Sequence, residues 1–191
     1  LSDLNLGGGY GVRYTDEDEA INIPARLAEL AAYLKEETER LGLPMPRFLM
    51  EPGRSIVADA GMTLYTVGSV KRIPGYKQYA AVDGGMTDNP RYALYQSRYT
   101  VYHAHKSGSM ERFDVVGRCC ESGDIIQPGV ELPGDTCRGD ILTVCTTGAY
   151  NYSMASNYNR LPRPAVVMLT PDRIYEAVRR ETFADLTGLD L

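Results

Sequence analysis

The chain has 191 residues, with 20 Lys and Arg against 25 Asp and Glu and a formal net charge of −5. This acidic balance argues against nucleic acid or an anionic membrane as a partner. No run of about 18 apolar residues predicts a transmembrane helix, and Leu1 to Leu6 lack the basic region of a signal peptide.

Residues 1–61 follow the pattern of a strand, a helix and a second strand. Leu4 and Leu6 end an apolar run that leads into the glycine turn Gly7-Gly8-Gly9-Tyr10-Gly11. From Pro24 apolar residues recur on one helical face, and Gly42 ends the helix. A second strand, Arg47–Met50, leads into Glu51-Pro52-Gly53-Arg54. This order predicts a βαβ unit, which needs a partner segment because it cannot bury both faces of its own strands.

From residue 62 the pattern changes to short strands rich in Thr, Tyr and Val between Gly/Pro turns. The predicted strands are residues 62–73, 79–82, 98–103, 113–117, 141–146 and 165–169, with turns at 106–109, 127–129 and 132–135. After Pro171, Ile174, Val178 and Phe183 predict a terminal helix. The expected fold class is α/β plus all-β: an incomplete parallel unit over 1–61, then an antiparallel barrel or sandwich over 62–191.

The two glycine turns are candidate sites for a phosphorylated ligand, because they follow parallel strands. Backbone amides of a glycine run can approach a phosphate closely, although a flexible turn would read the same way. Glu51 can pair with a protonated ring nitrogen and Arg54 can hold a phosphate or carboxylate, or the two can form a structural ion pair. The first turn fits neither the Rossmann fingerprint nor a P-loop.

Three further clusters combine chemistry-bearing side chains with glycine turns. Within residues 83–95, Arg91 and Tyr95 are four apart and would share a helical face as a carboxylate receptor. Cys120 and Glu121 could supply an acid and an anion that binds an ammonium. Residues 148–154 present Tyr150 to a flat ring. The alternatives are a polar loop with a packed Tyr, a buried Cys beside a surface Glu, and a core aromatic.

The four cysteines, Cys119, Cys120, Cys137 and Cys145, show no metal-binding spacing. They indicate reduced thiols in a cytosolic protein. His103 and His105 would lie on one face of a strand, but no third ligand stands near them and no metal site is expected.

The order and spacing of the clusters decide between these alternatives. GGGYG, EPGRSIVADAG, DGGMTDNPRYALY, CCESGD and GAYNYSMASNYN resemble the C-terminal motif series of the diaminopimelate decarboxylase family. These enzymes belong to the alanine-racemase-like, or fold type III, class that uses pyridoxal 5′-phosphate. The resemblance covers essentially the whole chain. It implies that residues 1–61 are the last βα units of a (β/α)8 barrel and that residues 62–191 form a Greek-key β-domain.

The resemblance also implies roles for individual residues. Gly7, Gly8 and Gly9 would cradle the cofactor phosphate, with Gly9 as the closest match, and Glu51 would face the pyridine nitrogen. The implied cofactor set further includes Gly53, Arg54 and Tyr150. Cys120 would donate a proton near the reacting carbon. The distal carboxylate of the substrate would be held by Arg54, Arg91 and Tyr95, its distal ammonium by Glu121, and Tyr150 would touch both substrate and cofactor.

The implied reaction is decarboxylation of meso-2,6-diaminopimelate to L-lysine, the last step of lysine biosynthesis, by a cytoplasmic homodimer whose active site is shared across the interface. The family's Schiff-base lysine is not matched, because Lys35, Lys71, Lys77 and Lys106 lie on a charged helix face or near exposed loops. We therefore expect this chain to be the C-terminal portion of the enzyme and inactive alone. The alternatives are another fold type III amino-acid decarboxylase and a non-catalytic interaction homologue that lost the lysine.

Overall fold

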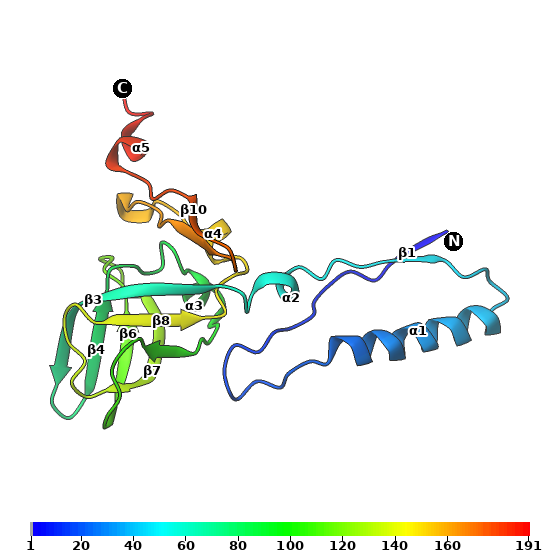
Figure 1. The fold of residues 1–191 in the computed structure, drawn as a ribbon, viewed down its shortest axis with the longest axis horizontal. Coiled ribbons are helices and arrows are strands. Elements are labelled where there is room, and N and C mark those ends of the chain that lie inside the picture. Colours follow the sequence, from blue (N-terminus) through cyan, green and yellow to red (C-terminus); the bar gives the residue numbers. More distant parts are fainter. Residues whose placement is uncertain (1) are drawn as a thin grey trace.

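The computed structural model describes residues 2–191, which form an arm, a six-stranded sheet and a C-terminal hairpin (Figure 1). The arm contains β1 (Asp3–Asn5), α1 (Ile23–Arg40), β2 (Arg47–Leu49) and α2 (Arg54–Val57). The sheet region contains β3 (Met62–Ile73), β4 (Lys77–Val82), α3 (Arg91–Tyr95), β5 (Val101–His103), β6 (Met110–Val116), β7 (Ile125–Pro133) and β8 (Ile141–Cys145). The last part contains α4 (Asn151–Met154), the 3-10 helix η1 (Tyr158–Arg160), β9 (Val166–Leu169), β10 (Ile174–Val178) and α5 (Phe183–Thr187). None of the described helices is both long and apolar enough to cross a membrane.

The arm has the predicted βαβ order. β1 and β2 pair in parallel, with Leu4 opposite Phe48. The helix between them begins where the Asn22 side chain accepts a hydrogen bond from the Ala25 N–H at 3.1 Å. It ends before Gly42, whose φ of +65° suits the left-handed position after a helix. Local capping chemistry therefore sets both ends of α1.

The apolar face of the arm is uncovered within the described chain. None of the α1 residues is buried, and Tyr33 is 60% exposed. Figure 1 shows α1 lying well to one side of the sheet region. This exposure agrees with the expectation that a single βαβ unit needs another segment to cover its faces.

The central sheet has the order β5-β8-β3-β4-β6-β7 and curls until its two edges meet. Strands β5 and β7 contact each other, and the Tyr99 N–H donates to Oε1 of Gln127 at 2.8 Å. The expected fold class, a β-barrel or sandwich after a parallel unit, is confirmed. One detail differs, because β4 and β6 pair in parallel, with Tyr79 opposite Asp114, while the other four strand pairs in this sheet are antiparallel.

The core lies inside this curled sheet. Strand β8 alternates with a period of two, and its inward residues Leu142 and Val144 are fully buried. The same core contains Phe113, Val115, Ile126 and Leu132 among other buried residues. Tyr65 reaches from β3 to donate a hydrogen bond to Asp88, and burial raises the pKa of Tyr65 well above its usual value.

Strand β7 was not predicted, because its sequence contains turn residues. The predicted turn at 127–129 is wrong, since Gln127-Pro128-Gly129 lies inside β7, and so is the predicted start of a turn at Leu132. The β6–β7 pairing shifts register between Phe113 and Val115, so a bulge accommodates Pro128 and Gly129. Residues 98–100 likewise precede β5 instead of belonging to it.

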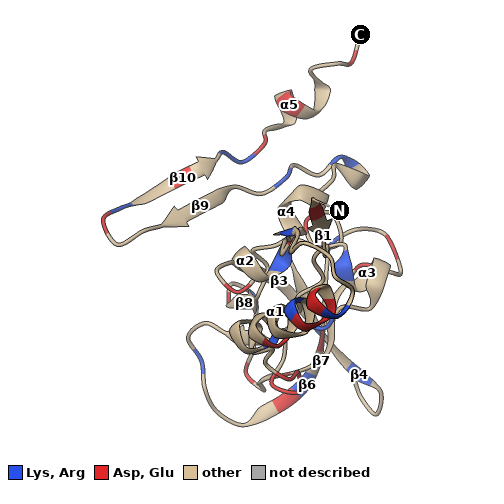
Figure 2. Ribbon diagram, turned by 90° about the vertical axis from the view of Figure 1, so that its right-hand side faces the viewer, with Lys and Arg blue, Asp and Glu red and all other residues tan. Residues whose placement is uncertain are grey.

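The helix predicted from Ile174 is also wrong over most of its length. Ile174–Val178 is strand β10, which pairs antiparallel with β9, and only Phe183–Thr187 is helical. Helix α5 begins at Thr182, whose side chain forms a capping box with Asp185. Figure 2 shows the β9–β10 hairpin standing away from the sheet region.

Two glycines join the arm to the sheet region. The Gly148 N–H donates to the carbonyl of Ala58 at 2.9 Å, and the Thr147 N–H donates to the carbonyl of Gly61 at 2.9 Å. A Cβ on Gly61 would lie 2.3 Å from the Gly148 Cα, and a Cβ on Gly148 would lie 2.0 Å from the carbonyl oxygen of Val57. The two backbones therefore meet at a distance that only glycine permits.

We predict that Gly148→Ala lowers the free energy of unfolding by about 1–3 kcal/mol, because the new methyl group forces the two backbones apart. Gly68→Ala is the matched control, since its Cβ would meet nothing closer than 3.7 Å. Chemical denaturation followed by circular dichroism measures both. Equal stability of the two variants would contradict the close packing.

Glu181 fixes the end of the hairpin to the preceding segment. Its carboxylate accepts hydrogen bonds from Arg163 Nε at 2.7 Å, from the Arg163 N–H at 2.8 Å and from Asn157 Nδ2 at 2.6 Å. The Arg163 side chain, followed by its N–H and by Asn157, lowers the pKa of Glu181 to about 2.

This lowered pKa predicts an acid-sensitive attachment. A carboxylate with a depressed pKa in the folded state stabilises it fully above the ordinary value of 4.5 and loses this effect as the pH falls to about 2. We expect the hydrogen-exchange protection factor of the Arg163 amide to fall across that window. In Glu181→Gln the protection of the Arg163 amide should be weak and should not change with pH between 4.5 and about 2. A fall in protection over this window in Glu181→Gln would contradict the role of the Glu181 carboxylate.

Candidate active site

The two glycine turns meet at the carboxyl ends of β1 and β2. The Glu51 N–H donates to the carbonyl of Gly7 at 2.8 Å. A Cβ on Gly8 would lie 1.8 Å from the carbonyl oxygen of Glu51, so Gly8 packs backbone to backbone on the second turn. Gly7 and Gly9 have φ values of +70° and +88°, and a Cβ on either would meet open space. The first turn therefore exposes backbone beside Glu51 with no side chain in the way.

The Glu51 carboxylate is oriented by a residue that the sequence reasoning missed. Asn5 Nδ2 donates to Glu51 Oε1 at 2.7 Å, and Asn5 Oδ1 accepts from the Gly7 N–H at 2.8 Å. Asn5 thus links the carboxylate to the glycine turn. Its position as the last residue of β1, directly before that turn, was the available signal.

Tyr150 lies between two of the predicted arginines. The Arg54 Cζ is 5.7 Å and the Arg91 Cζ is 6.0 Å from the centroid of its ring. Gly53 lies against the same side chain, because a Cβ on Gly53 would lie 2.7 Å from the Tyr150 hydroxyl oxygen. Arg91 also stacks over Tyr95 at 5.5 Å, as their spacing predicted. We call Arg54, Arg91, Tyr95 and Tyr150 the arginine cluster.

Both arginines of the cluster keep unused hydrogen-bond donors. The Nε atoms of Arg54 and Arg91 are buried and have no hydrogen-bond partner among the described residues. Arg91 is 5% exposed, and the one hydrogen bond from its side chain to a described residue runs from Nη2 to Ser97 Oγ at 3.3 Å. Buried guanidinium donors without partners are costly, so this arrangement favours an anionic ligand with planar oxygen acceptors.

Tyr14 and Tyr99 form a wall of the cluster that the sequence reasoning did not find. The Arg54 Cζ lies 5.6 Å from the Tyr14 ring centroid, and Tyr14 meets Tyr99 edge to face at 5.3 Å. Tyr99 is buried, and its hydroxyl donates to Asn151 Oδ1 at 3.4 Å. No local pattern marks these residues, because they meet only through contacts between distant segments.

Asp124 ties the turn at 119–124 to the loop that leads into α3. Its Oδ1 accepts from the Met86 N–H and its Oδ2 from the Cys119 N–H, both at 2.6 Å. Asp124 is 4% exposed, and a Cβ on Gly85 or Gly117 would lie 2.4 or 2.2 Å from its Oδ1. The glycines of both motifs therefore make room for one buried carboxylate. Its signal in the sequence was an Asp directly after a glycine turn.

Cys120 and Glu121 form no polar contact with the arginine cluster among the described residues. Both are exposed, and no hydrogen bond, ion pair or cation–π contact in residues 2–191 joins them to the cluster. Glu121 accepts hydrogen bonds from the Gly123 N–H at 3.3 Å and from the Tyr158 hydroxyl at 3.2 Å, which lower its pKa. Burial raises the pKa of the neighbouring Cys119 to about 11, so that thiol stays protonated.

Comparisons with known proteins show the family of this chain. Residues 15–148 match the family described as pyridoxal-dependent decarboxylase, C-terminal sheet domain. The chain is 49% identical over 190 residues to diaminopimelate decarboxylase of Bacillus subtilis and 45% identical over 192 residues to that of Halalkalibacterium halodurans. These alignments cover 98% and 100% of this chain but 43% and 44% of the relatives. The chain thus spans less than half of their length.

Solved structures show the same fold. Diaminopimelate decarboxylase of M. jannaschii in complex with L-lysine matches with a TM-score of 0.89 and 31% identity, over 100% of this chain and 43% of that one. Lysine/ornithine decarboxylase of Vibrio vulnificus, complexed with cadaverine, matches with a TM-score of 0.72 and 26% identity, over 84% of this chain and 41% of that one. The chain therefore belongs to the family of pyridoxal-dependent decarboxylases, whose C-terminal sheet domain it carries.

Proposed function

We propose that this chain is part of an enzyme that removes CO₂ from meso-2,6-diaminopimelate and leaves L-lysine. The observation that carries the proposal is the arginine cluster, in which two guanidinium groups with unused donors surround Tyr150. The relatives named diaminopimelate decarboxylase, at 45–49% identity, support the same reaction. The arm would then be the last βα units of a (β/α)8 barrel.

The residues at the glycine turns fit pyridoxal 5′-phosphate. Gly7 and Gly9 face open space, as a phosphate requires, and Gly8 lets the turn pack against the Glu51 backbone, so the three glycines together would form the phosphate cradle. Asn5 donates to Oε1 of Glu51, and Oε2 has no hydrogen-bond partner in residues 2–191, so it can accept a hydrogen bond from a protonated ring nitrogen. Gly53, Arg54 and Tyr150 complete the set. When bound, the cofactor supplies an electron sink for the pair left by the departing CO₂.

The arginine cluster would hold the distal carboxylate of the substrate. Arg54 and Arg91 can each form a planar two-point contact with a carboxylate, and Tyr95 can add a hydroxyl donor. Lysine and ornithine have one carboxylate, which is the group that decarboxylation removes. They have no distal carboxylate for this receptor to bind. The cluster thus favours diaminopimelate over those substrates.

Cys120 would deliver the proton that replaces CO₂, and Glu121 would bind the distal ammonium. The hydrogen bonds from Gly123 and Tyr158 favour the charged form of Glu121, which suits that role. Because both residues are exposed and form no polar contact with the arginine cluster within residues 2–191, we assign them to the site of a second copy of the chain. The enzyme would then be a homodimer with shared active sites.

The lysine that carries the cofactor in the family is not supplied by the lysines of this chain. Lys77 pairs with Asp114 at 2.6 Å and Lys106 with Asp140 at 2.7 Å, while Lys35 and Lys71 are exposed on α1 and β3. We therefore expect no CO₂ release from diaminopimelate by this chain alone. Its free cysteines support a reducing, cytoplasmic location.

We predict that Cys120→Ala in the intact enzyme lowers kcat by about 10²–10⁴-fold with little change in KM, since a proton donor acts in the transition state. Cys119→Ala is the matched control, because it removes the adjacent thiol that burial keeps protonated. Release of CO₂ from meso-diaminopimelate measures both. A similar loss of kcat in the two variants would defeat the assignment of Cys120.

We predict the opposite pattern for Arg91→Ala. The distal carboxylate is bound throughout the reaction, so KM should rise by roughly 10–100-fold while kcat changes far less. Arg138→Ala removes an exposed arginine elsewhere and should leave KM unchanged. If Arg91→Ala lowers kcat and leaves KM unaltered, the residue does not bind the distal carboxylate.

A further inference from the structure

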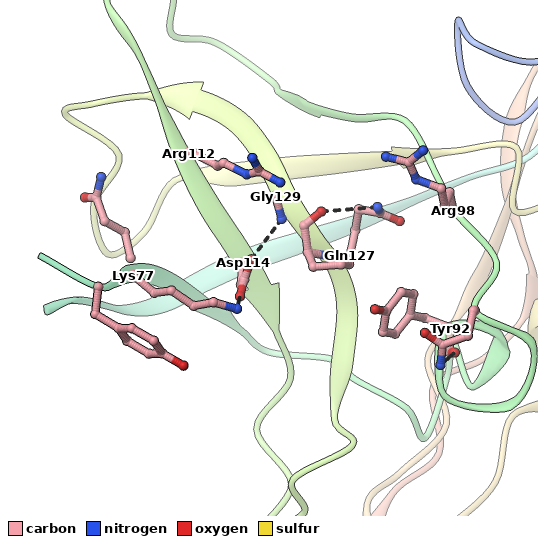
Figure 3. Close-up of a pocket in the computed structure, with 11 residues that line it drawn as sticks. Lys77, Tyr92, Arg98, Arg112, Asp114, Gln127 and Gly129 are labelled. Carbon is pink, nitrogen blue, oxygen red and sulfur yellow. Dashed lines mark hydrogen bonds and ion pairs between the residues drawn. The ribbon is translucent and has the colours of Figure 1, made fainter.

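A second cation-lined pocket lies on the sheet region, formed by β4, β6, β7 and α3 with the segment that follows α3 (Figure 3). Its volume is about 600 Å³, within the range of small-molecule sites. Its charged lining residues are Lys77, Arg98, Arg112 and Asp114. It shares helix α3 with the arginine cluster but uses different residues, Tyr92 of the helix and Gln96 directly after it.

The single carboxylate of the lining is already neutralised. Asp114 lies at the β6–β7 bulge, where its Oδ1 accepts from the Gly129 N–H at 2.8 Å and its Oδ2 from Lys77 Nζ at 2.6 Å. Its side chain is 12% exposed, so it anchors the Lys77 ammonium at the pocket without presenting a free negative charge. The hydrogen bond to Asp114 also raises the pKa of Lys77 and keeps it charged.

Arg112 leaves its positive charge without a carboxylate partner, and Arg98 has only an exposed one. A Cβ on Gly129 would lie 2.6 Å from Arg112 Nη2, so the glycine at this bulge lets Arg112 lie across β7. The Arg112 guanidinium has no hydrogen bond or ion pair with any described residue. Arg98 pairs with Glu17 at 2.8 Å, but both side chains are more than 60% exposed and solvent screens the pair.

We propose that this pocket binds a small dianion, either a phosphate ester or a dicarboxylate. Arg112 and Arg98 supply planar donors, Lys77 supplies a fixed ammonium, and Tyr92 offers an aromatic face to the carbon skeleton. The bulge is the feature that builds the site, because it places Asp114, Gly129 and Arg112 together. The inference does not depend on the proposed decarboxylase activity.

Calorimetric titration tests the pocket in the intact protein, purified with its bound pyridoxal phosphate and freed of excess cofactor, because free cofactor is itself a phosphate ester and would compete with the probes. Inorganic phosphate and succinate serve as separate probes, so that the preferred one tells a phosphate ester from a dicarboxylate. We expect saturable binding of at least one probe and a loss of affinity of about tenfold or more in Arg112→Ala. Arg138→Ala removes the same charge outside the pocket and should bind normally. Arg91→Ala should also retain the binding.

Three results would overturn the proposal. They are an absence of saturable binding of both probes, an affinity that Arg112→Ala leaves unchanged, and a loss of binding in Arg91→Ala with retention in Arg112→Ala. The last would place the anion in the arginine cluster. Because binding is measured directly, failure of the pocket is distinguishable from failure of the decarboxylase proposal, which CO₂ release reports.

Discussion

The contact between Gly61 and Gly148 is the constraint on which the candidate site depends. Two backbone hydrogen bonds, from Gly148 to Ala58 and from Thr147 to Gly61, hold the end of the arm against the turn before α4. Arg54 comes from one side of this junction and Tyr150 from the other. Any side chain at Gly148 would separate the two backbones and move Tyr150 away from Arg54, so the contact between these two residues depends on glycine at this position.

A second set of glycines works in the same way around Asp124. Gly85 and Gly117 leave space for its carboxylate, which binds the backbone of both the 83–90 loop and the 119–124 turn. A buried carboxylate that accepts hydrogen bonds from two backbone N–H groups can hold both loops in place without a helix or strand between them. The motif glycines therefore have a structural role, and the roles proposed for Arg91 and Cys120 depend on the loop positions that these glycines allow.

The features that could be predicted from the sequence are those that local sequence patterns control. The capped helix α1, the long strand β3 and the family followed from periodicity, glycine positions and motif order. Strand β7 was not predicted, because Pro128 and Gly129 are typical turn residues. They fit in a strand here only because of the bulge opposite Asp114. The apolar spacing of Ile174–Val178 suits a helix, but the segment is a strand because it pairs with β9. Tyr14 and Tyr99 were missed because only folding brings Tyr14 to Arg54 and Tyr99 to Tyr14, whereas Asn5 directly precedes the glycine turn and could have been found from its position.

The β9–β10 hairpin has a consequence for handling the chain. Its strands expose Val167, Leu169 and Ile174 at 54%, 68% and 74%, and within residues 2–191 no further strand pairs with either edge. An unpaired, apolar strand edge is a template for intermolecular β-sheet growth. Preparations of this chain should therefore self-associate as concentration rises, and charged substitutions on β9 would raise its solubility before any change to the core.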